Sequence, residues 1–116
     1  MAIAPPTAVE RDALRTVGFL LWPECRRIRA KPAADLLGVW VRYSAPEACA
    51  WCLAGAINLV SDHLPVHACR LAQLTLLTNG VLECFFTGTP MEMLIKWWDK
   101  VEVQTQSRLL RRLQKL

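Results

Sequence analysis

The sequence predicts a mainly α-helical fold, a compact bundle of about five helices around a buried central helix. Three observations predict it. The chain of 116 residues has the size of one domain, and 53% of the residues are hydrophobic against 21% charged, a composition that folds around a core. Apolar residues recur at helical spacing in several segments. Capping residues and prolines mark where these segments begin and end, so we expect a single helical domain over residues 1–116.

The first helix is expected to start at Pro5, Pro6 or Thr7 and to end before Pro23. Its apolar residues follow the three- and four-residue spacing of one helix face: Val9, Ala13, Leu14, Val17, Leu20 and Leu21.

The central helix is expected over residues 45–60. Ser44 and Glu47 have the S-x-x-E spacing of a capping box, in which both side chains satisfy free backbone amides at a helix start. The segment is apolar nearly all round, which predicts that it is buried. Small residues on one side would let another helix approach closely: Ala48, Cys52 and Gly55.

Two further helices follow. The first is expected to have Pro65 in its opening turn and to stop at Asn79 and Gly80, which suit a left-handed helix end. The second opens with a capping box from Thr89 to Glu92. Its expected apolar face consists of Met91, Leu94, Ile95 and Trp98.

The last helix, over residues 104–116, is predicted to be basic and amphipathic. One side carries Leu109, Leu110, Leu113 and Leu116. The opposite side carries Arg108, Arg111, Arg112 and Lys115.

The secondary structure of two segments is not decided by the sequence. Residues 24–43 begin with a basic stretch, and alternating residues near their end indicate a short strand or extended segment around 36–43. Residues 81–88 fit either a short helix or a buried strand, and periodicity does not decide between them.

Charge and cysteine content suggest the surroundings of the protein. The formal net charge is +4, and the basic residues gather in residues 24–42 and 100–116, which favours a negatively charged partner. Five cysteines and no secretory leader indicate reduced thiols in a cytoplasm. The longest uncharged stretch, residues 48–61, is shorter than the roughly 20 residues of a membrane-spanning helix, so we expect no membrane partner.

Two cysteines and two histidines resemble a zinc-finger spacing: Cys49, Cys52, His63 and His67. We interpret the match as false, because both cysteines lie inside the predicted central helix and Pro65 separates the histidines. We therefore expect no metal and no cofactor.

Enzymatic signatures are not readable in the chain. Cys25, beside two arginines, and Cys69, two residues after His67, are candidate nucleophiles, but neither has the other members of a catalytic set. Phosphate-binding loops and hydrolase or protease motifs do not occur. We expect a protein that acts by binding.

Tryptophan and arginine are the residue types enriched at interface hot spots, and the chain has five tryptophans. The basic face of the last helix could instead follow phosphates, so nucleic-acid binding is the alternative, and the same face would also serve a homodimer. The expected partner-binding residues are Trp40, Trp97, Arg26, Arg27, Arg108, Arg111, Arg112 and Lys115.

Three stretches together resemble the domain of unknown function 6197 family, small helical proteins of phages and bacteria. They are the cap at residues 44–47, the apolar run 51–57 and Trp97-Trp98-Asp99-Lys100 before the last helix. The resemblance implies a helical fold and a phage context, with no activity or site residues. Small phage proteins without catalytic signatures often block a host protein, as anti-CRISPR inhibitors do, so a host protein complex is the first expected partner.

Overall fold

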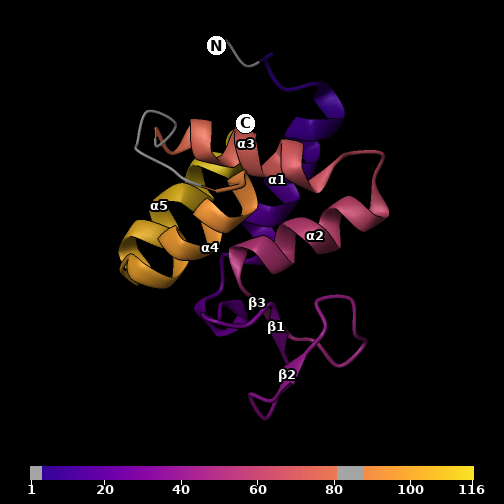
Figure 1. The fold of residues 1–116 in the computed structure, drawn as a ribbon, viewed down its shortest axis with the longest axis vertical. Helices are drawn as coiled ribbons and strands as arrows, with labels where there is room; N and C mark the ends of the chain where they lie inside the picture. The colour runs from indigo at the N-terminus through magenta and orange to yellow at the C-terminus, as the bar shows by residue number, and fades with distance from the viewer. Residues whose placement is uncertain (1–3, 81–87) are drawn as a thin grey trace.

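The computed structural model describes residues 4–80 and 88–116. These residues form a mainly α-helical fold with one small sheet (Figure 1), which confirms the predicted fold class. The α-helices are α1 (Ala8–Leu20), α2 (Leu53–His63), α3 (Ala68–Thr78), α4 (Pro90–Lys100) and α5 (Val103–Gln114). The remaining elements are the 3-10 helix η1 (Glu24–Arg26) and the strands β1 (Ala33–Ala34), β2 (Trp40–Val41) and β3 (Ala50–Trp51). Within the described ranges, every helix is too short or too polar to cross a membrane.

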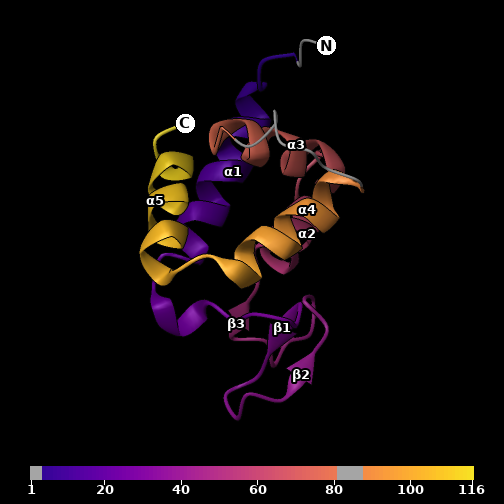
Figure 2. The ribbon, with the colours of Figure 1, turned by 60° about the vertical axis from the view of Figure 1, so that its left-hand side comes forward.

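The helices form one body, and the sheet extends from one end of it (Figures 1 and 2). Helix α2 packs against α1, α3 and α4, which agrees with the expected central helix, and α1 packs along α5. The strand order is β2-β1-β3, with both pairs antiparallel. Strand β2 lies inside the segment expected to be extended, whereas β1 was not predicted.

Helix α1 starts where the sequence predicts, and a capping box that was not predicted fixes its start. The amide of Glu10 donates to Thr7 Oγ1 at 3.2 Å, and the amide of Thr7 donates to Glu10 Oε1 at 2.9 Å. Arg70 of α3 donates to Glu10 Oε2 at 3.0 Å and to the carbonyl oxygens of Ala4 and Pro5. The hydrogen bond from the Thr7 amide, together with Arg70, lowers the pKa of Glu10.

Replacing Glu10 with glutamine is expected to lower the free energy of unfolding by about 1 kcal/mol at pH 7. Because the folded-state pKa of Glu10 is depressed, its contribution is complete above the unfolded-state pKa and is lost as pH falls through the folded-state value. Urea unfolding at pH 7 and pH 3 measures this, and the difference from wild type should be smaller at pH 3 than at pH 7. Glu47→Gln, at an exposed position, is the control. An equal difference at both pH values would contradict the prediction.

The predicted start of the central helix was wrong. The Ser44–Glu47 box caps no helix, residues 50–51 form β3, and α2 begins at Leu53. Backbone pairing explains the difference, because the amide of Cys49 donates to the carbonyl of Ala34 in β1 at 2.9 Å. The cap of α2 is the Cys52 thiol, whose sulfur accepts the amide of Gly55 at 3.3 Å.

Helix α3 also starts later than predicted, at Ala68 rather than near Pro65. It ends as predicted, with Asn79 as C-cap and Gly80 at φ 72°. The open assignment of residues 81–88 as helix or strand falls almost entirely outside the described residues.

Helices α4 and α5 match the sequence prediction most closely. The Thr89–Glu92 capping box forms, and Leu94 and Trp98 are buried, although Ile95 is exposed rather than part of the core. The indole N–H of Trp98 donates to the carbonyl of Ile28 at 2.8 Å. In α5 the buried leucines are Leu109, Leu110 and Leu113.

Candidate interaction sites

The structure distributes the predicted partner-binding residues over three places. Trp40 belongs to the hairpin formed by β1 and β2, and Trp97 belongs to α4. The basic residues lie on or beside α5, in two groups: Arg26 and Arg27 in and after η1, and Arg108, Arg111, Arg112 and Lys115 on or just after the helix.

The turn between β1 and β2 presents apolar side chains to solvent. Leu36 is 90% exposed and Leu37 is 88% exposed. Val39 and Trp40, on the way into β2, are 56% and 58% exposed. Large contiguous apolar patches are uncommon on proteins that act alone, and they mark interaction sites. These four residues, Leu36, Leu37, Val39 and Trp40, are called the hairpin tip below.

Hydrogen bonds from a single carboxylate hold the turn of the hairpin. Asp35 Oδ1 accepts the amides of Leu37 and Val39, each at 2.9 Å, and the carbonyl of Asp35 accepts the amide of Gly38 at 3.0 Å. Gly38 has φ 78°, a conformation that glycine adopts without strain. Lys31 Nζ donates to the carbonyl of Gly38 at 3.2 Å. The tip therefore has a defined backbone before any partner arrives.

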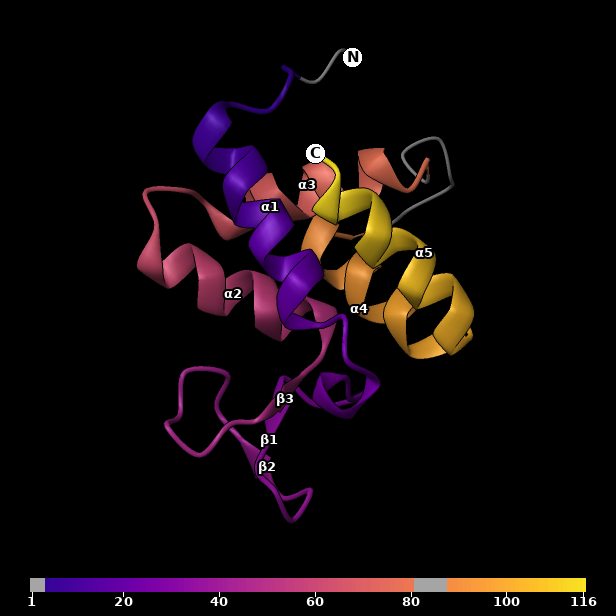
Figure 3. The ribbon, with the colours of Figure 1, turned by 180° about the vertical axis from the view of Figure 1, so that it is seen from behind.

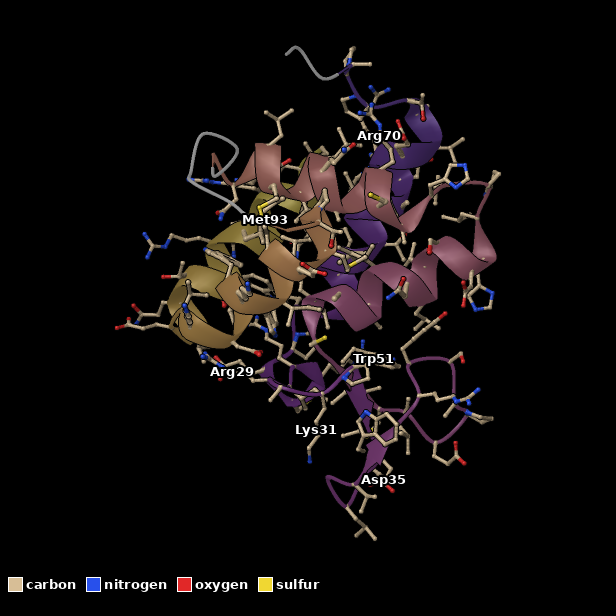
Figure 4. All side chains as sticks on the ribbon, in the orientation of Figure 1. Arg29, Lys31, Asp35, Trp51, Arg70 and Met93 are labelled. Carbon is tan, nitrogen blue, oxygen red and sulfur yellow. The ribbon has the colours of Figure 1, made fainter. Side chains whose placement is uncertain are left out.

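The base of the hairpin is attached to the helical body by its backbone. The amide of Cys52, just before α2, donates to the carbonyl of Pro32 at 3.2 Å. Gly55 lies so close to Pro32 that a methyl group on Gly55 would overlap the Pro32 carbonyl oxygen. Figure 4 shows Asp35 farther from the helices than Lys31 and Trp51, so the hairpin extends outward from this attachment.

A second attachment joins the segment before β1 to the end of α4. Arg29 donates to the carbonyl oxygen of Asp99 at 2.9 Å and to that of Val101. Asp99 Oδ1 accepts the amide of Ala30 at 3.0 Å, and Ala30 has φ 62°. A left-handed alanine is strained, so the hydrogen bonds on either side hold the chain in this bend.

A pocket of about 470 Å³ lies beside these attachments, between the hairpin base, α2 and α4. Its polar groups are Lys31, Cys52, Asn58 and Asp99. Burial raises the pKa of the Cys52 thiol, and the amide of Gly55 that donates to the sulfur opposes the rise only in part. Cys52 is thus a neutral capping group with little nucleophilic character.

The zinc-like residues are not gathered: Cys49 and Cys52 lie before α2, although they were predicted to lie inside it, His63 ends α2 and His67 precedes α3. Cys52 caps the start of α2 and His63 ends it, so their backbones lie roughly 16.5 Å apart at about 1.5 Å per residue. In residues 4–80 and 88–116, no three His, Cys, Asp or Glu side chains form a group suited to a metal ion.

Arg27, which was predicted to bind a partner, is partly buried and makes several hydrogen bonds within the molecule. Its guanidinium donates to the carbonyl of Leu21 at 2.6 Å, to the carbonyl of Trp22 and to Ser107 Oγ at 2.8 Å. It thereby satisfies carbonyl groups after the end of α1 and connects them to α5. Burial lowers the pKa of Arg27, and the charge of Glu24 opposes this.

Trp97 is also less available than predicted. It is partly buried and packs against the core, with its ring centroid 6.5 Å from that of Trp98. Its position beside Trp98 on α4 gives it a core contact that residue type and helix face did not reveal.

The basic face of α5 is exposed as predicted. Arg108, Arg111, Arg112 and Lys115 are all exposed on the side opposite the buried leucines. The Arg111 guanidinium lies over the Trp22 indole, 4.9 Å from the ring centroid, and Arg27 lies 5.9 Å from the same centroid. Trp22 is 36% exposed and connects the end of α1 to the basic face.

Comparisons with protein-family models, curated proteins and solved structures found no match for this chain. The resemblance to the domain of unknown function 6197 family therefore stays a prediction.

The two most exposed leucines, Leu36 and Leu37, were not among the predicted site residues. A signal was present, because Asp35 and Gly38 have the spacing of a tight turn, with Asp first and Gly fourth. Interpreting residues 36–43 as one extended segment concealed this turn.

Proposed function

We propose that this protein is a non-enzymatic interaction protein, phage-borne, that binds and inhibits a host protein complex such as a component of bacterial defence, and that the hairpin tip is its docking element. One observation supports the proposal most: Leu36 and Leu37 are about nine-tenths exposed on a turn whose backbone is already fixed. A rigid apolar projection loses little conformational freedom on binding, so most of its burial contributes to affinity.

The energetics favour a partner with an apolar cleft. Burying one leucine side chain contributes about 2 kcal/mol, and Trp40, three residues after Leu37 in the same hairpin, adds an exposed aromatic surface of the kind that dominates interfaces. The charges within residues 31–51 sum to zero, with Lys31 and Arg42 against Asp35 and Glu47, and most of the positive charge of residues 24–42 precedes Lys31. This balance offers no general attraction to a polyanion or an anionic membrane, which favours a protein partner.

Replacing Leu36 and Leu37 together with aspartate is expected to weaken binding of the partner about a thousandfold, because two buried anchors are lost. The stability of the fold should change little, since both side chains are outside the core. The measurement is an affinity pull-down of the tagged protein from nuclease-treated bacterial lysate, read by mass spectrometry and followed by titration of the captured protein.

The matched control is Val9→Asp, which places a charge at another exposed apolar residue, on α1. Capture of the same protein by wild type and by the control, with loss in the double variant, would support the proposal. Equal capture by the double variant, or capture that disappears with nuclease, would contradict it.

A further inference from the structure

A second surface, independent of the hairpin, is formed by α5 and the end of α1. Both helices lie on the near side in Figure 3, and a methyl group added to Gly18 of α1 would lie 2.7 Å from the carbonyl oxygen of Leu110. Gln114 donates to the carbonyl of Gly18 at 3.0 Å. The C-terminal half of α1 is therefore in direct contact with α5.

Positive charge dominates this surface. Residues 103–116 contain no acidic residue, and their cations all lie on the exposed side of α5. Arg108 precedes Arg112 by four residues, and Arg111 precedes Lys115 by four, so each pair is separated by about 6 Å along the helix axis. The result is a cluster of four basic residues on one helix face: Arg108, Arg111, Arg112 and Lys115.

Two aromatic side chains lie at the end of α1, which packs against α5. Phe19 is 60% exposed near the C-terminal end of α1, and the amide of Trp22 donates to the Phe19 carbonyl at 3.4 Å, so the two residues lie close together. Trp22 supports the Arg111 guanidinium from one side at 4.9 Å from the ring centroid. The stack holds the guanidinium in place, which leaves its outer plane as a stacking surface.

We propose that the surface formed by Phe19, Trp22 and the four cations of α5 binds single-stranded nucleic acid. The cations contact phosphates, and unpaired bases stack on Phe19 and on the guanidinium of Arg111. A duplex keeps its base faces covered, whereas a single strand offers both phosphates for the cations and free base faces for Phe19 and Arg111. The combination of charge and stacking surfaces favours single strands.

The test is a binding titration of the whole protein with fluorescein-labelled oligothymidylate of fifteen nucleotides, followed by fluorescence anisotropy. Four phosphate contacts predict a slope of about −2.8 for log affinity against log salt, which is about a 50-fold loss between 50 and 200 mM salt. Arg112→Gln with Lys115→Gln should halve the slope to about −1.4. Lys31→Gln with Arg42→Gln, which removes the same charge at the hairpin, should leave the slope unchanged.

A second readout separates stacking from charge. Phe19→Ala should weaken binding of oligothymidylate about tenfold and leave unchanged the binding of an abasic oligonucleotide of equal length. Poly-glutamate is the probe for an acidic protein surface. Equal binding of poly-glutamate and oligothymidylate, equal effects of Phe19→Ala on both oligonucleotides, or no binding of oligothymidylate would each overturn the proposal.

The proposals for the hairpin tip and for the α5 surface can be contradicted independently of each other. The Leu36→Asp, Leu37→Asp variant should bind oligothymidylate like wild type, and the Arg112→Gln, Lys115→Gln variant should still capture the protein partner.

Discussion

Replacing Trp98 with alanine is expected to lower the free energy of unfolding by about 4 kcal/mol, which is a large part of the stability of a domain of this size. The side chain is fully buried, so its removal leaves a cavity between α4 and its neighbours. The loss also frees the carbonyl of Ile28, which accepts the indole N–H at 2.8 Å. Chemical unfolding in urea, monitored by circular dichroism, measures the change.

The variant Trp98→Phe separates the contribution of the buried ring from that of the hydrogen bond to the Ile28 carbonyl. It keeps most of the buried ring but removes the hydrogen-bond donor, so we expect a loss of about 2 kcal/mol from the unpaired carbonyl and the smaller ring. Trp40→Ala is the control for removing an indole, because Trp40 is 58% exposed and belongs to the hairpin tip. A loss below about 1 kcal/mol for Trp98→Ala would show that the core does not depend on this side chain.

Replacing Gly55 with alanine is expected to lower the free energy of unfolding by about 3 kcal/mol. Elsewhere in a helix this substitution commonly stabilises, because alanine has the higher helix propensity. Here the added methyl group overlaps the carbonyl oxygen of Pro32, and a backbone atom cannot move away as a flexible side chain can. The expected sign is therefore opposite to that of helix propensity, and urea unfolding measures it.

Gly18→Ala is the matched comparison for Gly55→Ala. Its methyl group would lie 2.7 Å from the carbonyl oxygen of Leu110, a milder overlap, so we expect a smaller loss. Gly55→Ala should also weaken partner binding, because Pro32 belongs to the attachment of the hairpin to α2. Stability equal to or above that of wild type would contradict the close approach of Gly55 to Pro32.

The helices with local signals were predictable from the sequence. Thr89, Pro90 and Glu92 define the start of α4 within four residues, and the leucine spacing of α5 identifies its buried side. Such signals act through neighbours in the chain, so they do not depend on the rest of the fold.

The start of α2 was not predictable from local capping signals. Ser44 and Glu47 have capping-box spacing, but the residues after them pair with β1, which lies about 15 residues earlier in the chain. Backbone pairing at that distance overrides a local preference worth about 1 kcal/mol. The same limit explains β1, whose two alanines carry little strand signal.

The candidate sites were predictable only in part. The basic face of α5 and Trp40 could be located from the sequence, because charge and residue type are local properties. The hydrogen bonds from Arg27 to the carbonyl groups of Leu21 and Trp22 could not, since they depend on where the chain turns after α1. The exposure of Leu36 and Leu37 was missed for another reason, because the turn signal of Asp35 and Gly38 lies next to residues that were interpreted as one extended segment.

The pairing of α1 with α5 bears on the order of folding during synthesis. A hydrogen bond between Gln114 and Gly18 spans 96 residues, and the buried side of α1 completes its contacts only when α5 is present. On the ribosome, α1 emerges long before α5, so the side of α1 around Gly18 stays accessible to chaperones until α5 has been synthesised. A chain that stalls before α5 is expected to remain open and to be a substrate for proteolysis.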